Sequence, residues 1–158
     1  MGFAKLSLKG RALKLLAQRE HSRRELERKL APHVQEGEDL AAVLDALEQR
    51  GFISEQRVAE SIVHSKAARF GTARLTQELR NKGLDDELVR ATAEQLRATE
   101  LERAHAVWRQ RFGTLPGDAK EKARQLRFMA SRGFALSDAS RILREAMDAA
   151  SDDSVDPI

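Results

Sequence analysis

The chain has 158 residues, a formal net charge of +3 and no cysteine, so disulfides, thiolate metal sites and cysteine nucleophiles are excluded. Its length fits one ordinary domain or a short array of smaller units. It contains no apolar run of signal-peptide or membrane-span length, so we expect a cytoplasmic protein that does not enter the membrane.

The composition favours helix over strand. The chain has 24 alanines against 16 valine, isoleucine and threonine residues together. Side chains branched at Cβ lose rotamer freedom in a helix, whereas alanine loses none. The three prolines fall in stretches that resemble loop or tail. The composition therefore predicts an all-α protein.

Apolar residues recur at helical spacing almost throughout the chain. In chain order, Ser22 and Glu25 form a capping box that predicts a helix start. The segment 40–50 has one apolar face and is followed by Gly51, which favours a helix end. Ser54 is the expected N-cap of the next helix. Continued to the C-terminus, this pattern predicts about nine helices with short connections.

The tetrapeptide RFGT occurs twice, at 69–72 and 111–114. Neither copy continues into the lysine-containing sequence of a phosphate-binding loop, and no strand precedes either one. We interpret RFGT as the trace of a duplication that closes the first helix of one repeat and opens its second. A second capping box, Asp118 with Glu121, lies after the second copy.

Three turns share the pattern base, glycine, large apolar residue, centred on Gly51, Gly83 and Gly133. Near them, Leu26/Leu30, Leu75/Leu79 and Leu126/Ala130 align, with spacings of 49 and 51 residues. Such a period indicates a repeat architecture. We therefore predict an elongated array of three tandem three-helix, helix-turn-helix-like repeats. The predicted divisions are an N-terminal segment 1–7, repeats 8–53, 54–98 and 99–147, and an acidic disordered tail 148–158.

Charge alternates in step with these repeats. The net charges are +6, −5, +4, −4, +6 and −4 for segments 1–35, 36–64, 65–82, 83–102, 103–132 and 133–158. Basic residues gather on the middle helix of each repeat and its approaches, so we expect a basic side. This side either binds a polyanion or a charged protein filament, or is a solvated surface that keeps the protein soluble. Its candidate residues are Arg23, Arg24, Arg28, Lys66, Arg69, Arg74, Arg80, Lys82, Arg109, Arg111, Arg124 and Arg127.

Other candidate sites have less support. The four histidines are scattered, without metal-ligand spacing or a partnered nucleophile. The aromatic residues among the bases could stack on single-stranded nucleic acid, but their helical spacing favours the core. A helix-turn-helix that reads bases would insert the helix after Gly83, which begins with Asp85, Asp86 and Glu87 and would be repelled by phosphate.

Three stretches closely resemble the RecX family of recombinase modulators. They are LKGRALKLLAQREHSRRELERKL, VLDALEQRGFISEQRVAESIVHSKAARFGTARLTQELRNKGLDDELV and RQLRFMASRGF. The resemblance covers roughly residues 7 to 147 in unbroken order. The third repeat matches most loosely, because Ala130 stands where positions 30 and 79 have leucine.

The resemblance implies a bacterial regulator that binds the RecA recombinase filament on DNA and restrains its ATPase activity, strand exchange and growth in DNA repair. It also implies no catalysis and no cofactor, and it makes the basic residues above candidates for filament binding. We expect weak, sequence-independent DNA contact and a monomer when free. Two alternatives stay open, namely a nucleic-acid-binding helical module that acts without RecA and a helical scaffold for an unrelated acidic partner.

Overall fold

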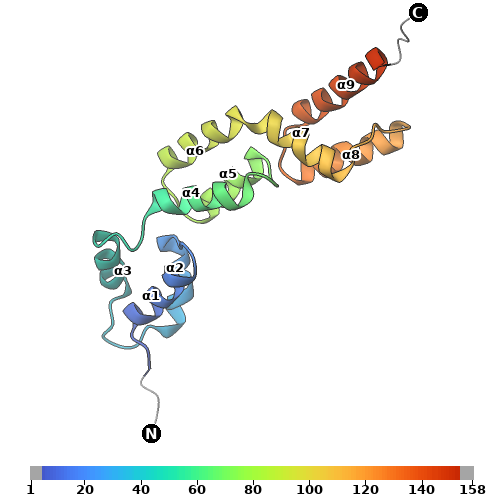
Figure 1. Ribbon diagram of the computed structural model, residues 1–158. Helices are drawn as coiled ribbons and strands as arrows, with labels where there is room; N and C mark the ends of the chain where they lie inside the picture. The colour runs from blue at the N-terminus through green and yellow to red at the C-terminus, as the bar shows by residue number, and fades with distance from the viewer. Residues whose placement is uncertain (1–4, 154–158) are drawn as a thin grey trace, which may run out of the picture. The chain divides into compact units, whose positions relative to one another are not determined.

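A computed structural model describes residues 5–153 of the chain (Figure 1). Within these residues nine α-helices and one short 3-10 helix form and no strand occurs, which confirms the all-α prediction. The elements are α1 (Leu8–Gln18), α2 (Arg23–Leu30), the 3-10 helix η1 (Ala31–His33), α3 (Leu40–Gln49), α4 (Glu55–Lys66), α5 (Thr72–Asn81), α6 (Asp86–Ala98), α7 (Glu100–Arg111), α8 (Ala119–Ser131) and α9 (Leu136–Asp153).

Contacts group the chain into two compact units. Unit 1 comprises the described residues up to Ser61 together with Leu79–Val89. Unit 2 comprises Ile62–Glu78 and the described residues from Arg90 onward. The helices follow one another as three successive triplets, whereas the division between the units passes through α4, α5 and α6. The exact boundaries of the three repeats stay a prediction.

The core of unit 1 is formed by α1, α2 and α3, which lie together at the blue end of the chain (Figure 1). Its apolar cluster follows the helical spacing of the sequence. The buried members are Leu8, Ala12, Leu26, Leu30, Leu44, Leu47 and Ile53. Ser22 caps α2, and its capping box with Glu25 is complete, as predicted.

The core of unit 2 includes a cluster contributed by α7, α8 and α9, in which α7 and α8 both contact α9 (Figure 1). Its buried members are Ala104, Val107, Trp108, Met129, Phe134, Ala139, Ile142 and Leu143. Trp108 donates its indole N–H to Oε1 of Gln125 at 2.8 Å, and the Gln125 amide donates to the Thr114 carbonyl at 3.2 Å. Both polar groups in this cluster are therefore satisfied.

The predicted alignment of the third repeat was wrong by one residue. On α8 the fully buried positions are Gln125 and Met129, whereas Leu126 is only partly buried and Ala130 is exposed. Gln125 and Met129 lie 50 residues after Leu75 and Leu79, which are both fully buried. Gln125, which pairs with Trp108, thus occupies the core position that corresponds to Leu75. Because glutamine is polar, an alignment based on leucines does not detect this position.

The prediction for RFGT holds for the first copy and was wrong for part of the second. At 69–72 the tetrapeptide lies between α4 and α5, and Thr72 is the first residue of α5. At 111–114 it closes α7, but α8 begins only at Ala119, with Asp118 accepting from the Glu121 N–H as the cap. Residues 114–118 therefore form an additional connection before α8.

The three base–glycine–apolar turns share one backbone geometry. Gly51, Gly83 and Gly133 have φ of 79°, 77° and 89°, which glycine adopts without a Cβ clash. The N–H of the residue after each glycine bonds back to the helix, to the carbonyls of Leu47, Leu79 and Met129. Each turn is thus a Schellman motif. The first one follows α3, while the other two follow the middle helices α5 and α8.

The acidic tail predicted to be disordered from residue 148 is helical in its first part. Helix α9 continues to Asp153. The remaining five residues, 154–158, lie outside the described part of the chain, as do residues 1–4 of the predicted N-terminal segment.

Candidate functional site

Three partly buried residues of the predicted basic side pair with carboxylates within their own unit. Arg23 pairs with Glu27, Asp45 and Glu48, and the bond to Asp45 raises the pKa of its guanidinium above the ordinary value. Lys66 pairs with Glu78. Lys82 pairs with Glu25 at 3.0 Å. Because these charges already have partners, they contribute less to the attraction of an external anion.

Glu25 is the centre of the ion pairs around the start of α2. Its carboxylate lies 2.6 Å from Arg19 and 3.0 Å from Lys82, and it also accepts the Ser22 backbone N–H. Burial raises the pKa of Glu25, but the hydrogen bonds from Arg19, Lys82 and Ser22 together outweigh burial and lower the pKa to about 2. Arg19 was absent from the predicted set. Its ion pair depends on the folded path of the chain before Ser22.

His21, next to this cap, is almost fully buried. Its Nδ1 lies 3.0 Å from the Arg19 carbonyl and its Nε2 lies 3.2 Å from the Lys29 ammonium. These partners fit a neutral ring that donates from Nδ1 and accepts at Nε2. Burial lowers the pKa of His21, and the charges of Arg19 and Lys29 lower it further, against the bond to the Arg19 carbonyl.

The other predicted bases are exposed, Arg69 in the loop after α4 and the rest on helices. Arg124 pairs with Glu121 on the same face of α8, and Arg109 lies 3.3 Å from His105 Nδ1. No ion pair within the described residues involves the remaining exposed bases Arg24, Arg28, Arg69, Arg74, Arg80, Arg111 and Arg127.

Three of these unpaired arginines, together with Arg132, surround two phenylalanine rings in unit 2. We call this set the arginine–phenylalanine cluster: Arg69, Arg74, Arg111 and Arg132 with Phe70 and Phe128. Their guanidinium carbons lie within cation–π distance of the rings. Arg74, Arg69 and Arg132 lie 4.0, 5.3 and 5.4 Å from the centre of Phe70, while Arg111 and Arg132 each lie 5.1 Å from the centre of Phe128. Arg132 therefore links the two rings.

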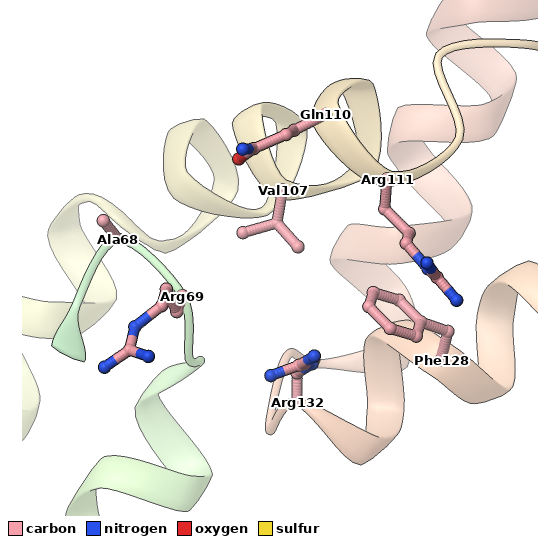
Figure 2. Close-up of a pocket in the computed structure, with 7 residues that line it drawn as sticks. All are labelled: Ala68, Arg69, Val107, Gln110, Arg111, Phe128 and Arg132. Atoms are coloured by element: carbon pink, nitrogen blue, oxygen red, sulfur yellow. The ribbon is translucent and has the colours of Figure 1, made fainter.

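The cluster borders an open cavity of about 250 Å³. Figure 2 shows Arg69 on the loop after α4, Val107, Gln110 and Arg111 on α7, and Phe128 and Arg132 on α8 and at its end. Ala68 completes the lining, so the cavity has three arginines, one neutral amide and an apolar wall, with no carboxylate among its lining residues.

A close backbone contact joins the loop after α4 to the turn after α8, and both segments line this cavity. The Gly71 N–H donates to the Arg132 carbonyl at 2.8 Å. A Cβ on Gly71 would lie 2.2 Å from the Gly133 carbonyl oxygen and 2.5 Å from the Phe134 nitrogen. Only glycine allows this approach. The contact fixes the loop with Arg69 and Phe70 beside the turn with Arg132.

Arg103 on α7 also binds the loop between α4 and α5. Its guanidinium donates to the carbonyls of Ala67, Phe70 and Leu96, and its Nε donates to Thr99 Oγ1. Burial lowers the pKa of Arg103, while the nearby Glu100 raises it. The Glu100 carboxylate accepts the Thr72 N–H at the start of α5, where a negative charge is favourable.

Sequence reasoning missed Arg132 and Arg103. Arg132 was recognised only as the base of a glycine turn, and its position between two rings depends on a contact with residues some 60 positions earlier in the chain. Arg103 resembles any other surface base on an amphipathic helix. Its bonds to loop carbonyls appear only when α7 packs against the α4–α5 connection.

Within residues 5–153, no cluster of three or more potential metal ligands occurs. None of the helices over the same residues combines the length and apolarity that crossing a bilayer requires.

Comparison with known proteins identifies the family. Residues 54–92 match the family model of the second three-helix domain of RecX, and residues 98–143 match that of the third. The chain is 55% identical over 141 residues to the regulatory protein RecX of Leptothrix cholodnii, covering 89% of this chain and 90% of the relative. It is 50% identical over 153 residues to the regulatory protein RecX of Ralstonia nicotianae, covering 97% and 96%.

Among solved structures, the fold is similar to that of RecX from Lactobacillus salivarius, with a TM-score of 0.70, 18% identity and coverage of 87% of this chain and 93% of that one. A second crystal structure, described as regulatory protein RecX, has the same TM-score and covers 85% and 70%. The matches with curated relatives extend through all three helix triplets. The chain belongs to the RecX family of regulatory proteins.

Proposed function

We propose that this protein binds the RecA–DNA filament and restrains RecA: its ATPase activity, its strand exchange and the growth of the filament. In this way it regulates recombinational DNA repair. The proposal is supported by the extent of its similarity to named RecX regulatory proteins, which reaches 97% of the chain. It acts as a binding protein and not as a catalyst, within the cytoplasm and as a monomer when free.

The structural observation that supports the proposal is a group of exposed arginines that have no carboxylate partner within the described residues. Several of them belong to the arginine–phenylalanine cluster, while Arg24, Arg28, Arg80 and Arg127 lie on middle helices. Guanidinium groups make forked hydrogen bonds to phosphate and to carboxylate, so they suit a filament made of both DNA and protein. The contact to DNA is expected to be independent of base sequence and to weaken steeply with salt.

The test is RecA ATPase activity on single-stranded DNA, titrated with this protein at fixed salt. We expect the rate to fall at less than one molecule of the protein per RecA. A rate that stays unchanged at saturating protein, together with tight binding to bare DNA, would replace this proposal with the alternative of a nucleic-acid-binding module that acts without RecA.

A further inference from the structure

The arginine–phenylalanine cluster has more hydrogen-bond donors than acceptors. Each guanidinium carries five N–H donors. Arg69 reaches only the Ser65 carbonyl, at 3.4 Å, and Arg74 only the Ser131 carbonyl, at 3.3 Å. The guanidinium groups of Arg111 and Arg132 donate no hydrogen bond within the described residues. Most N–H groups of these four arginines therefore have no hydrogen-bond acceptor within the described residues.

The cluster also concentrates positive charge without an internal counter-charge. Arg132 shares Phe70 with Arg69 and Arg74 and shares Phe128 with Arg111, so the four cations are close neighbours. None of them forms an ion pair within residues 5–153, unlike Arg23, Lys66 and Lys82. Like charges held together repel, and a bound anion removes that repulsion.

The arrangement of the arginines indicates which anion fits. In Figure 2 they are spread along the cavity, from Arg69 through Arg132 to Arg111, instead of converging on one point. A polyanion that carries one charge on each repeating residue or nucleotide can contact these arginines one after another. A single carboxylate or free phosphate can pair with only one or two of them.

The remaining lining suits a sugar and does not suit reading a base. Val107 and the Phe128 ring form an apolar wall, and Gln110 is the one neutral hydrogen-bonding side chain among the residues that line the cavity. With so few groups for base edges, binding would be independent of sequence. Guanidinium planes can in addition stack on unpaired bases, which are available only in a single strand.

We propose that the cavity bordered by Arg69, Arg111 and Arg132 is a phosphodiester site that holds the backbone of single-stranded nucleic acid. The inference deepens the proposed function, since it takes the DNA of the filament as the source of phosphate, but its test needs no RecA. Arg132 is the central contact, because it is the member shared by both rings.

The test is fluorescence anisotropy of a labelled oligo(dT) with the full chain and two variants, Arg132→Gln and Arg111→Gln. The main-chain bond from Gly71 to the Arg132 carbonyl does not need the Arg132 side chain, and Arg111 is exposed at the end of α7. Circular dichroism checks the fold of each variant. The matched control is Arg141→Gln, which removes the same charge from an exposed arginine paired with Glu145 on α9.

We expect Arg132→Gln and Arg111→Gln each to weaken binding about tenfold, and to reduce the slope of log affinity against log salt by about 0.7, the value for one lost phosphate contact on a single strand. Arg141→Gln should change affinity less than twofold. A polyglutamate peptide should displace the oligonucleotide much less well than unlabelled oligo(dT) does. Unchanged affinity and salt slope in both folded cavity variants would overturn the proposal.

RecA ATPase assays with the same variants separate this inference from the proposed function. If the cavity variants bind oligo(dT) normally but lose the inhibition of RecA, the cavity takes carboxylates of a protein partner, and the phosphodiester proposal fails while the proposed function stands. The phosphodiester proposal also fails if polyglutamate displaces the labelled oligonucleotide as well as unlabelled oligo(dT) does. If the full chain binds oligo(dT) through these residues and leaves RecA unaffected, the proposed function fails and the phosphodiester site stands.

Discussion

Gly71 donates its backbone N–H to the carbonyl oxygen of Arg132 at 2.8 Å, which joins the connection after α4 to the turn after α8. The contact is too close for any side chain at position 71, since a Cβ there would lie 2.2 Å from the Gly133 oxygen. Gly71 has no positive φ, unlike Gly133. Its role is therefore close approach and not an unusual backbone conformation.

Replacement of this glycine should destabilise the protein although its φ does not lie in the left-handed region. For Gly71→Ala we expect a loss of about 1–3 kcal/mol in the free energy of unfolding, because the main chain of Gly133 must move to admit the methyl group. Urea unfolding followed by circular dichroism measures it. Gly117→Ala is the matched control, since a Cβ there meets nothing within 4 Å. Equal stability of the two variants would show that the contact is not rigid.

Sequence reasoning succeeded for features that depend on neighbouring residues, and this contact is not one of them. The glycine turns, the capping box at Ser22 and the buried leucines of α5 all depend on residues close together in the chain, so local pattern rules predict them. The RFGT motif was recognised as a turn for the same reason. The close approach of Gly71 to Gly133 depends on residues more than 60 positions apart, and no local rule gives it.

The errors have equally specific causes. Gln125 occupies a core position because its amide bonds to Trp108 and to the Thr114 carbonyl, and no hydrophobic pattern shows a buried glutamine. At the basic side, the spacing of residues identified exposed arginines but could not tell which had partners. Lys66 and Lys82 pair with glutamates on other elements, and those pairs form only in the folded chain.

The ion pairs of Glu25 should make the protein sensitive to acid. The pKa of Glu25 is lowered from 4.5 to about 2, so its contribution is complete above about pH 4.5 and is lost as the pH falls towards 2. We expect Glu25→Gln to cost about 1–2 kcal/mol at pH 7, a value reduced by the solvent exposure of Arg19, and to flatten the dependence of stability on pH across that interval.

Unfolding by urea between pH 2.5 and 7 measures this dependence. Glu27→Gln serves as the control, because Glu27 is half-exposed in its pair with Arg23 and should cost less than Glu25. A Glu25→Gln variant with the same pH profile as the unaltered protein would contradict the assigned role of the cluster around Glu25.

Arg103 should be more important for stability than an ordinary helix arginine. Arg103→Lys keeps the charge but loses the planar fork that serves the carbonyls of Ala67, Phe70 and Leu96. We expect a cost of about 2 kcal/mol, because at least one buried carbonyl is left unpaired. Amide hydrogen exchange should increase in residues 67–71. The control is Arg97→Lys, at an exposed position on α6, which should leave both the stability and the exchange rates unaltered. If Arg103→Lys changes them no more than Arg97→Lys does, the bonds of Arg103 to the loop carbonyls do not stabilise the protein.

The final prediction places filament binding on the middle helix of the second triplet. Arg74 and Arg80 are both exposed on α5, each one residue from a fully buried leucine, so they flank the buried stripe and face solvent. The Arg74→Glu/Arg80→Glu double variant should weaken binding to the RecA–DNA filament at least about tenfold. Its fold should survive, because the main loss is the stacking of Arg74 on Phe70, worth about 0.5–1 kcal/mol.

Co-sedimentation with the filament, beside circular dichroism, measures both effects. The control is Arg141→Glu/Arg144→Glu, which makes the same change of four charge units at two exposed positions on α9. General electrostatic repulsion would weaken both double variants equally, whereas a specific contact weakens only the first. If the well-folded α5 variant binds as the unaltered protein does, the basic side is a solvated surface, and the contact to the filament must then be sought on the acidic third helices, α3, α6 and α9.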